Sequence, residues 1–233
     1  MSASISFDAL PARETLYRNV REFFSLQKIT EVETSLFPLN ISAYQSPVFQ
    51  ISQQCRDEAT DRRHRTEFSV LQWSQPDWTS EQVLLGLDHF LMAIFAGDFE
   101  PERRTFRQAF IQRLGFDPEK LSAADLRQEA RRLGLNVSLG EDRLAWLKLM
   151  FIHFIEPTLG IDIPLYLTDL PSEWRDTQYD GSERLNSNID VYIDGIKVGS
   201  ALNSDQILSI VFGLDRLLMI ILETRQIEKV MCR

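Results

Sequence analysis

The chain has 233 residues, a formal net charge of −9 and a pI near 4.9. This length suits one domain spanning 1–233, and the acidic balance disfavours unaided nucleic-acid binding, because neutralising phosphates takes a surplus of lysine and arginine. The two cysteines lack the spacing of a disulfide framework or a metal site. No apolar run of membrane-spanning length and no signal peptide is apparent, so we expect a cytoplasmic protein.

The expected elements follow from changes in hydrophobic period along the chain. In chain order these patterns predict a helix at 10–26, a strand at 29–34, strands at 48–53 and 68–73 around a charged loop, helices at 78–95, 103–114, 122–133 and 140–154, strands at 164–168, 189–193, 196–199 and 208–212, and a helix at 214–224. Ser122 with Asp125 indicates a helix N-cap, and Asp194-Gly195 indicates a tight turn. We therefore predict an α+β fold, an antiparallel sheet flanked by helices with a helical insertion at about 79–154.

Two arginine-bearing motifs lie far apart in the sequence. The first comprises Cys-Arg-Asp-Glu at 55–58 and His-Arg-Thr-Glu-Phe at 64–68, and the second is Phe-Gly-Leu-Asp-Arg-Leu at 212–217. A guanidinium offers a planar fork of donors that matches phosphate oxygens. Arg56 and Arg216 could thus converge on one triphosphate, and ATP is the first ligand that the sequence predicts.

The order of these motifs resembles that of class II aminoacyl-tRNA synthetases. A helix and Glu-Val-Glu-Thr at 31–34 correspond to motif 1, Arg56 with His-x-x-Glu-Phe to motif 2, and Gly-x-Asp-Arg at 213–216 to motif 3. Within that class the chain most resembles the lysyl-tRNA synthetase branch, especially its compact paralogue that attaches lysine to elongation factor P. The resemblance covers nearly the whole chain and includes no anticodon-binding domain.

The resemblance implies a homodimer through residues 10–34, although the pattern of this helix alone fits equally well an ordinary amphipathic helix packed on its own sheet. It also implies elongation factor P as a protein acceptor. A tRNA partner is not favoured, because the chain is acidic and no anticodon-binding barrel precedes the core.

The same resemblance implies a role for each motif residue. Arg56 and Arg216 are the candidate catalytic residues: Arg56 would bridge the α-phosphate and the amino-acid carboxylate, stabilising the charge that builds as the adenylate forms, and Arg216 would bind the γ-phosphate. Glu58 matches an acid that contacts adenine or the amino acid, His64 a residue near the outer phosphates, and Phe68 a ring that stacks on adenine. The implied nucleotide-binding residues are Arg56, Glu58, His64, Phe68, Asp215 and Arg216.

The chain departs from the family pattern at the metal and amino-acid sites. The family segment Glu-x-x-Asn-Gly-Phe-x-Glu, whose acids hold magnesium, corresponds to 197–204, where Lys197 and Ser204 replace both acids. Magnesium needs carboxylate or phosphate oxygens, so bound Mg²⁺ is not favoured and no metal ligand is assigned. Gln72 replaces the acid that contacts the lysine ammonium, and a neutral amide cannot neutralise that charge. The implied substrate-binding residues are Glu58, Gln72 and Ser200.

Three hypotheses follow. The chain is an ATP-dependent ligase that makes an acyl-adenylate and transfers the acyl group to a protein amine or another nucleophile. Alternatively, it is a catalytically inactive paralogue that acts as a regulatory or partner-binding subunit. The least favoured hypothesis is lysyl-tRNA synthesis. The retained arginines favour the ligase, whereas the lost acids favour the inactive paralogue.

Overall fold

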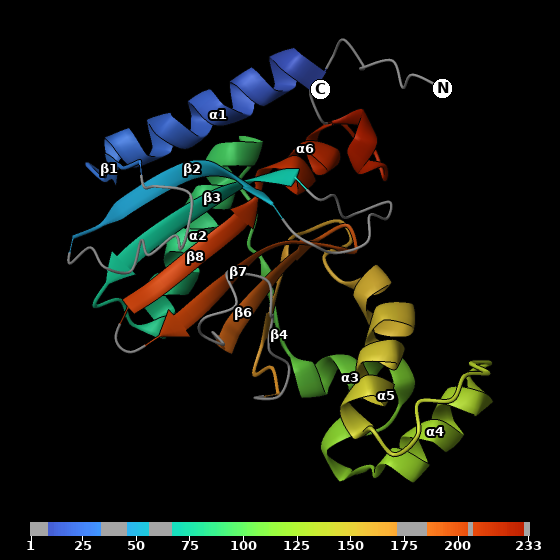
Figure 1. The fold of residues 1–233 in the computed structure, drawn as a ribbon. Coiled ribbons are helices and arrows are strands. Elements are labelled where there is room, and N and C mark those ends of the chain that lie inside the picture. Colours follow the sequence, from blue (N-terminus) through green and yellow to red (C-terminus); the bar gives the residue numbers. More distant parts are fainter. Residues whose placement is uncertain (1–8, 34–45, 56–66, 172–185, 205–206, 231–233) are drawn as a thin grey trace.

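An eight-stranded mixed sheet organises the fold, with strand order β1-β2-β3-β8-β7-β6-β5-β4 (Figure 1). The structure, a computed structural model, describes residues 9–33, 46–55, 67–171, 186–204 and 207–230. Its strands are β1 (Thr30–Glu31), β2 (Val48–Cys55), β3 (Glu67–Pro76), β4 (Glu102–Thr105), β5 (Leu165–Thr168), β6 (Asn186–Ile193), β7 (Ile196–Ser204) and β8 (Ile207–Gly213).

The helices of the described residues flank this sheet, so the predicted α+β class is confirmed. They are α1 (Ala9–Leu26), α2 (Ser80–Phe95), α3 (Phe106–Leu114), α4 (Ala123–Arg132), α5 (Arg143–Met150) and α6 (Leu214–Ile221), with 3₁₀ turns η2 (Pro118–Lys120), η4 (Glu156–Thr158) and η5 (Ile227–Lys229) and a π-helical turn η3 (Phe151–Ile155). None of them is both long and apolar enough to cross a membrane.

The centre of the sheet is antiparallel, as predicted, whereas both edges are parallel. The β1 strand pairs in parallel with β2, and β4 pairs in parallel with β5. A parallel pair needs a long crossover, and the chain between β4 and β5 supplies one that contains α3, α4 and α5. The predicted tight turn between β6 and β7 is confirmed, because Asp194 and Gly195 both have positive φ, at 52° and 67°.

One predicted helix begins later than expected. Residues 102–105 are not helical but form β4, whose Glu102 N–H donates to the carbonyl of Pro164 at 2.8 Å. The helix starts after Thr105, because the Thr105 hydroxyl accepts from the Gln108 N–H while the Gln108 side chain accepts from the Thr105 N–H. This capping box is a strong start signal. The Ser122–Asp125 cap predicted for α4 is confirmed as a second box.

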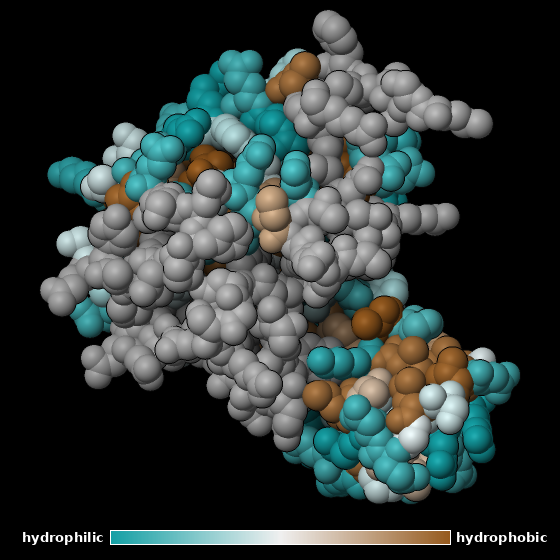
Figure 2. Space-filling view, in the orientation of Figure 1, coloured by the Kyte–Doolittle hydropathy of each residue, from teal (hydrophilic) through white to brown (hydrophobic). Residues whose placement is uncertain are grey.

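Two hydrophobic clusters divide the core. The larger one joins α1, α2 and α6 to one face of the sheet, and Figure 1 shows α2 behind that sheet. The smaller one gathers α3, α4, α5 and the π-helical turn around Phe110, Trp146 and Phe151, and it reaches the sheet through Leu165 and Tyr192. The helices with their own core therefore begin at α3, while α2 packs with the main sheet. Figure 2 shows hydrophobic residues at the surface of the α3–α5 region, at the lower right.

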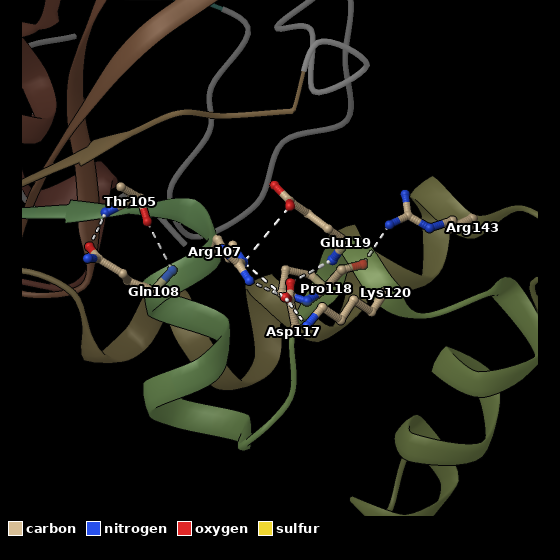
Figure 3. Close-up of polar contacts among 8 residues, drawn as sticks. All are labelled: Thr105, Arg107, Gln108, Asp117, Pro118, Glu119, Lys120 and Arg143. Carbon is tan, nitrogen blue, oxygen red and sulfur yellow. Dashed lines mark hydrogen bonds and ion pairs between the residues drawn. The ribbon is translucent and has the colours of Figure 1, made fainter.

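A polar junction fixes the α3–α5 region (Figure 3). The Arg107 guanidinium donates two hydrogen bonds to Asp117, at 3.0 and 2.5 Å, and this bonding holds the pKa of the Asp117 carboxyl below its ordinary value. Asp117 also caps η2 by accepting from the Glu119 N–H. Arg143, at the start of α5, donates to the carbonyl of Pro118 at 2.6 Å. The junction thus ties α3, η2 and α5 together.

Candidate functional site

The sheet has an apolar face and a polar face. Residues that are paired on neighbouring strands point to the same face of the sheet. The apolar face, which carries Leu71, Trp73 and Phe212, packs on the helices. On the opposite face, the pairing of β2, β3, β8, β7 and β6 aligns one row of buried residues: Gln50, Gln72, Val211, Ser200 and Asp190. Neighbouring strands are about 4.8 Å apart, so Gln72 and Ser200 lie roughly 10 Å apart in this row.

A buried acid joins Lys197 to Ser200. Asp190 is only 1% exposed, and its Oδ1 atom accepts a hydrogen bond from the Ser200 hydroxyl at 2.9 Å. The Lys197 ammonium lies 3.0 Å from the same Asp190 oxygen and is itself largely buried. The Lys197 ammonium is therefore paired with an acid within the sheet. A pair buried to this degree depends on both partners, since removing either one leaves an uncompensated charge.

Arg216 lies beside this cluster. It lies in the first turn of α6, a helix that begins directly after Gly213, and it is half-buried. Its Nη1 atom donates to the backbone carbonyl of Lys197 at 2.8 Å. The structure thus brings together the predicted residues Arg216 and Ser200 through Lys197 and Asp190.

Asp215, the neighbour of Arg216, makes different contacts. Its buried carboxylate accepts from the Arg13 guanidinium at 2.6 Å and from the Ser69 N–H at 2.7 Å. Burial lowers the pKa of Arg13, but the Asp215 charge and hydrogen bond outweigh it and raise that pKa above its ordinary value. Arg13 also donates to the carbonyl of Val230 at 2.6 Å. Asp215 therefore links α6 to α1, β3 and the C-terminal segment, and its role toward a nucleotide stays a prediction.

Gln72 has a buried oxygen that no described residue satisfies. Its side chain is on the polar face and the residue is only 6% exposed, yet its Oε1 atom has no hydrogen-bond partner within the described part of the chain. The same holds for the hydroxyl oxygens of Ser74, two residues along β3, and Ser52 on β2. Each such oxygen costs about 1–3 kcal/mol, and native proteins contain few of them. Three on one sheet face are consistent with a binding surface.

The remaining predicted residues divide between described and undescribed positions. Phe68 is half-buried on β3 opposite Gln54, and strand alternation puts it on the same face as Gln72. Arg56, Glu58 and His64 lie outside the described residues. The predicted convergence of Arg56 with Arg216 therefore stays a prediction.

The chemistry of the described side chains does not fit a bound magnesium ion. Among these residues, no group of three or more His, Cys, Asp or Glu side chains is placed to hold a metal. The carboxylate nearest to the predicted site, that of Asp190, already faces the Lys197 ammonium, and a cation at this place opposes a second cation. The half-buried Arg216 carries a guanidinium, a group whose planar donors match phosphate oxygens.

Sequence reasoning missed two contacts that organise the site. Arg13 lies 202 positions from Asp215, and no local pattern signals such a distant ion pair. Asp190 was visible as an acid near the altered segment, and its position in a strand of β-branched neighbours signals burial. An acid expected to be buried needs a cation, and this requirement could have pointed to Lys197.

Comparison with protein-family models finds no match. The chain is similar to curated proteins named elongation factor P–(R)-beta-lysine ligase. The relative from Photobacterium profundum is 31% identical over 164 residues, which make up 69% of this chain and 50% of the relative. Relatives from Pectobacterium atrosepticum and Yersinia enterocolitica are 27% and 28% identical over 164 residues, with the same coverage. The chain thus spans about half the length of the curated relatives it matches.

Proposed function

Because the chain is a relative of the elongation factor P–(R)-β-lysine ligases and has a class II synthetase-like α+β core, we propose that it is an ATP-dependent ligase. The nucleotide would bind on the polar face of the sheet, beside α6. The acyl acceptor would be a protein amine, with elongation factor P as the first candidate.

One observation carries the nucleotide part of this proposal. Arg216 is half-buried at the start of α6 and is fixed to the backbone of β7 through the Lys197 carbonyl. A guanidinium is a planar fork of five donors, and this shape matches phosphate oxygens. Fixing it in advance reduces the entropy lost when a nucleotide binds.

The proposed reaction has two steps. In the first, an amino-acid carboxylate oxygen attacks the α-phosphorus of ATP, an O–P bond forms, and the bond to the β-phosphate breaks to release pyrophosphate. In the second, an acceptor amine attacks the acyl carbon, an amide forms, and AMP leaves while the amine loses a proton. Arg216 would stabilise the phosphate charge in the first step.

The first step can be tested by amino-acid-dependent pyrophosphate exchange and by calorimetric titration with ATP. Arg216→Met should weaken ATP binding at least about tenfold, since charge-assisted hydrogen bonds to a phosphate contribute roughly 1.5–3 kcal/mol each. Arg225→Met is the matched control, because Arg225 is exposed and pairs with Asp194 on the β6–β7 turn. Equal ATP affinity of the two variants would remove the nucleotide site from this position.

The alternative is an inactive paralogue that keeps the fold and acts as a regulatory or partner-binding subunit. The Lys197–Asp190 pair supports it, because a neutralised acid is a poor metal ligand. Pyrophosphate exchange separates the two proposals. Exchange that depends on an amino acid and is lost in Arg56→Ala supports the ligase, whereas ATP binding without exchange supports the inactive paralogue.

We further propose a homodimer formed through residues 10–34. Three residues of the outer surface of α1, namely Leu10, Glu14 and Arg18, are exposed in the single chain, and shallow hollows run along this helix. Light scattering at micromolar concentration tests the assembly, and a monomeric mass would contradict it. The acidic net charge of −9 disfavours tRNA as a partner.

A further inference from the structure

The polar face of the sheet carries three buried oxygens on β2 and β3, with Gln72 between the two serines. Gln72 Oε1 and Ser74 Oγ belong to alternate residues of β3, so their Cα atoms are roughly 7 Å apart. Ser52 Oγ lies on the neighbouring strand, diagonal to Gln72, where such residues are about 7–8 Å apart. All three side chains are uncharged. A small ligand could therefore contact Gln72 together with one of the two serines.

The acid on the described strands of this face is already paired with a cation. Within the described parts of β2, β3, β8, β7 and β6, the one carboxylate on the polar face is that of Asp190, and the Lys197 ammonium lies 3.0 Å from it. Arg216 adds a further positive charge beside β7. A ligand that brought its own ammonium group close to Gln72 would meet an uncharged amide instead of a carboxylate. Burying a cation without a counter-charge is strongly unfavourable.

We propose that this face binds an amino acid whose uncharged side chain ends in an amide or a hydroxyl, in preference to lysine or β-lysine. An amide or hydroxyl both donates and accepts, so it can satisfy the Gln72 amide and a neighbouring serine hydroxyl at once. The inference rests on the proposed function for its place in a ligase. The preference itself concerns amino-acid binding alone and does not require ATP.

The decisive measurement is direct binding of glutamine, serine and lysine without nucleotide, by ligand-observed NMR. The wild-type protein should bind glutamine or serine and should bind lysine at least tenfold more weakly. Gln72→Glu should reverse this order by supplying a carboxylate. Gln53→Glu is the matched control, because Gln53 lies on β2 but is exposed, and it should leave the order unchanged.

Gln72→Glu puts a charge in a buried place and could prevent folding. A second, uncharged variant therefore tests the same contact. Gln72→Leu removes the unsatisfied oxygen while keeping a similar volume, so it should raise the unfolding temperature and abolish glutamine binding. If it leaves glutamine affinity unchanged, Gln72 does not contact the ligand and the proposal is wrong. Wild-type preference for lysine, or no binding of any tested amino acid, also overturns it. If no tested amino acid binds, these oxygens bind only water.

These outcomes remain distinct from failure of the ligase proposal. Glutamine binding without any ATP binding would leave the preference for a neutral amino acid intact and remove the ligase. ATP binding combined with a preference for lysine would leave the ligase proposal intact and remove the preference for an uncharged side chain. Pyrophosphate exchange driven by glutamine or serine would support both.

Discussion

The ion pair between Arg13 and Asp215 should be among the largest single electrostatic contributions to stability in this chain. Asp215 is 2% exposed and receives two hydrogen bonds, from Arg13 and from the Ser69 N–H. Arg13→Met would leave a buried carboxylate with only the Ser69 bond. Removing one partner of a buried pair costs about 3–5 kcal/mol, and in a chain of this size this corresponds to a fall in Tm of roughly 6–20 °C.

The magnitude can be checked against a pair of the same chemistry at the surface. Arg21 and Glu31 form an ion pair with a bidentate contact, but their side chains are 52% and 41% exposed. Such pairs contribute about 0–1 kcal/mol, so Arg21→Met should shift the urea midpoint little. Both variants can be compared by urea unfolding followed through the fluorescence of the buried tryptophans, Trp73 and Trp146.

A double-mutant cycle separates the ion pair from the packing of the arginine stem. Asp215→Asn in the Arg13→Met background should cost clearly less than it does in the wild type, because the carboxylate has already lost its cation. Additive costs, or equal losses in Arg13→Met and Arg21→Met, would show that the pair contributes no more than a surface contact. The reasoning from burial would then be refuted.

Three other predictions concern separate parts of the fold. Lys197→Glu should place a second acid beside buried Asp190 and lower stability, and Mg²⁺ should restore part of the loss; thermal unfolding with and without Mg²⁺ tests this, and a loss indifferent to Mg²⁺ would count against it. Asp117→Asn should lower the unfolding temperature at pH 7, because the Arg107 contact depresses the pKa of Asp117; this stabilisation is present above the ordinary value and lost as pH falls below about 4, so the two proteins should converge in acid. Gly160→Ala should impair folding, since Gly160 has φ +67° and a Cβ there would lie 2.3 Å from a backbone oxygen of β6; unchanged expression and unfolding temperature would contradict it.

The sequence predicts most of the fold because its local signals agree. The apolar stripe of α1, the capping serine of α4 and the Asp194-Gly195 turn are short-range patterns, and each is present in the structure. The strand at 102–105 was mistaken for helix because its pairing partner, β5, lies about sixty positions further along the chain. Such pairing overrides local propensity and leaves no mark within a short window.

The site is harder to predict than the fold. The motif order predicts Arg216 as a site residue, and this stays a prediction although the residue lies half-buried beside β7. The charge balance between Lys197 and Asp190 depends on two strands meeting in one register. The sequence predicts only the absence of an acid at position 197, whereas the structure pairs the lysine found there with a buried acid.

The contact of Arg216 with a main-chain oxygen has an evolutionary consequence. Every amino acid at position 197 presents the same carbonyl, whatever its side chain. A lineage can therefore replace an acid by a lysine there without removing this anchor of the neighbouring guanidinium. The side chain at position 197 can therefore change while the position of the Arg216 guanidinium is kept.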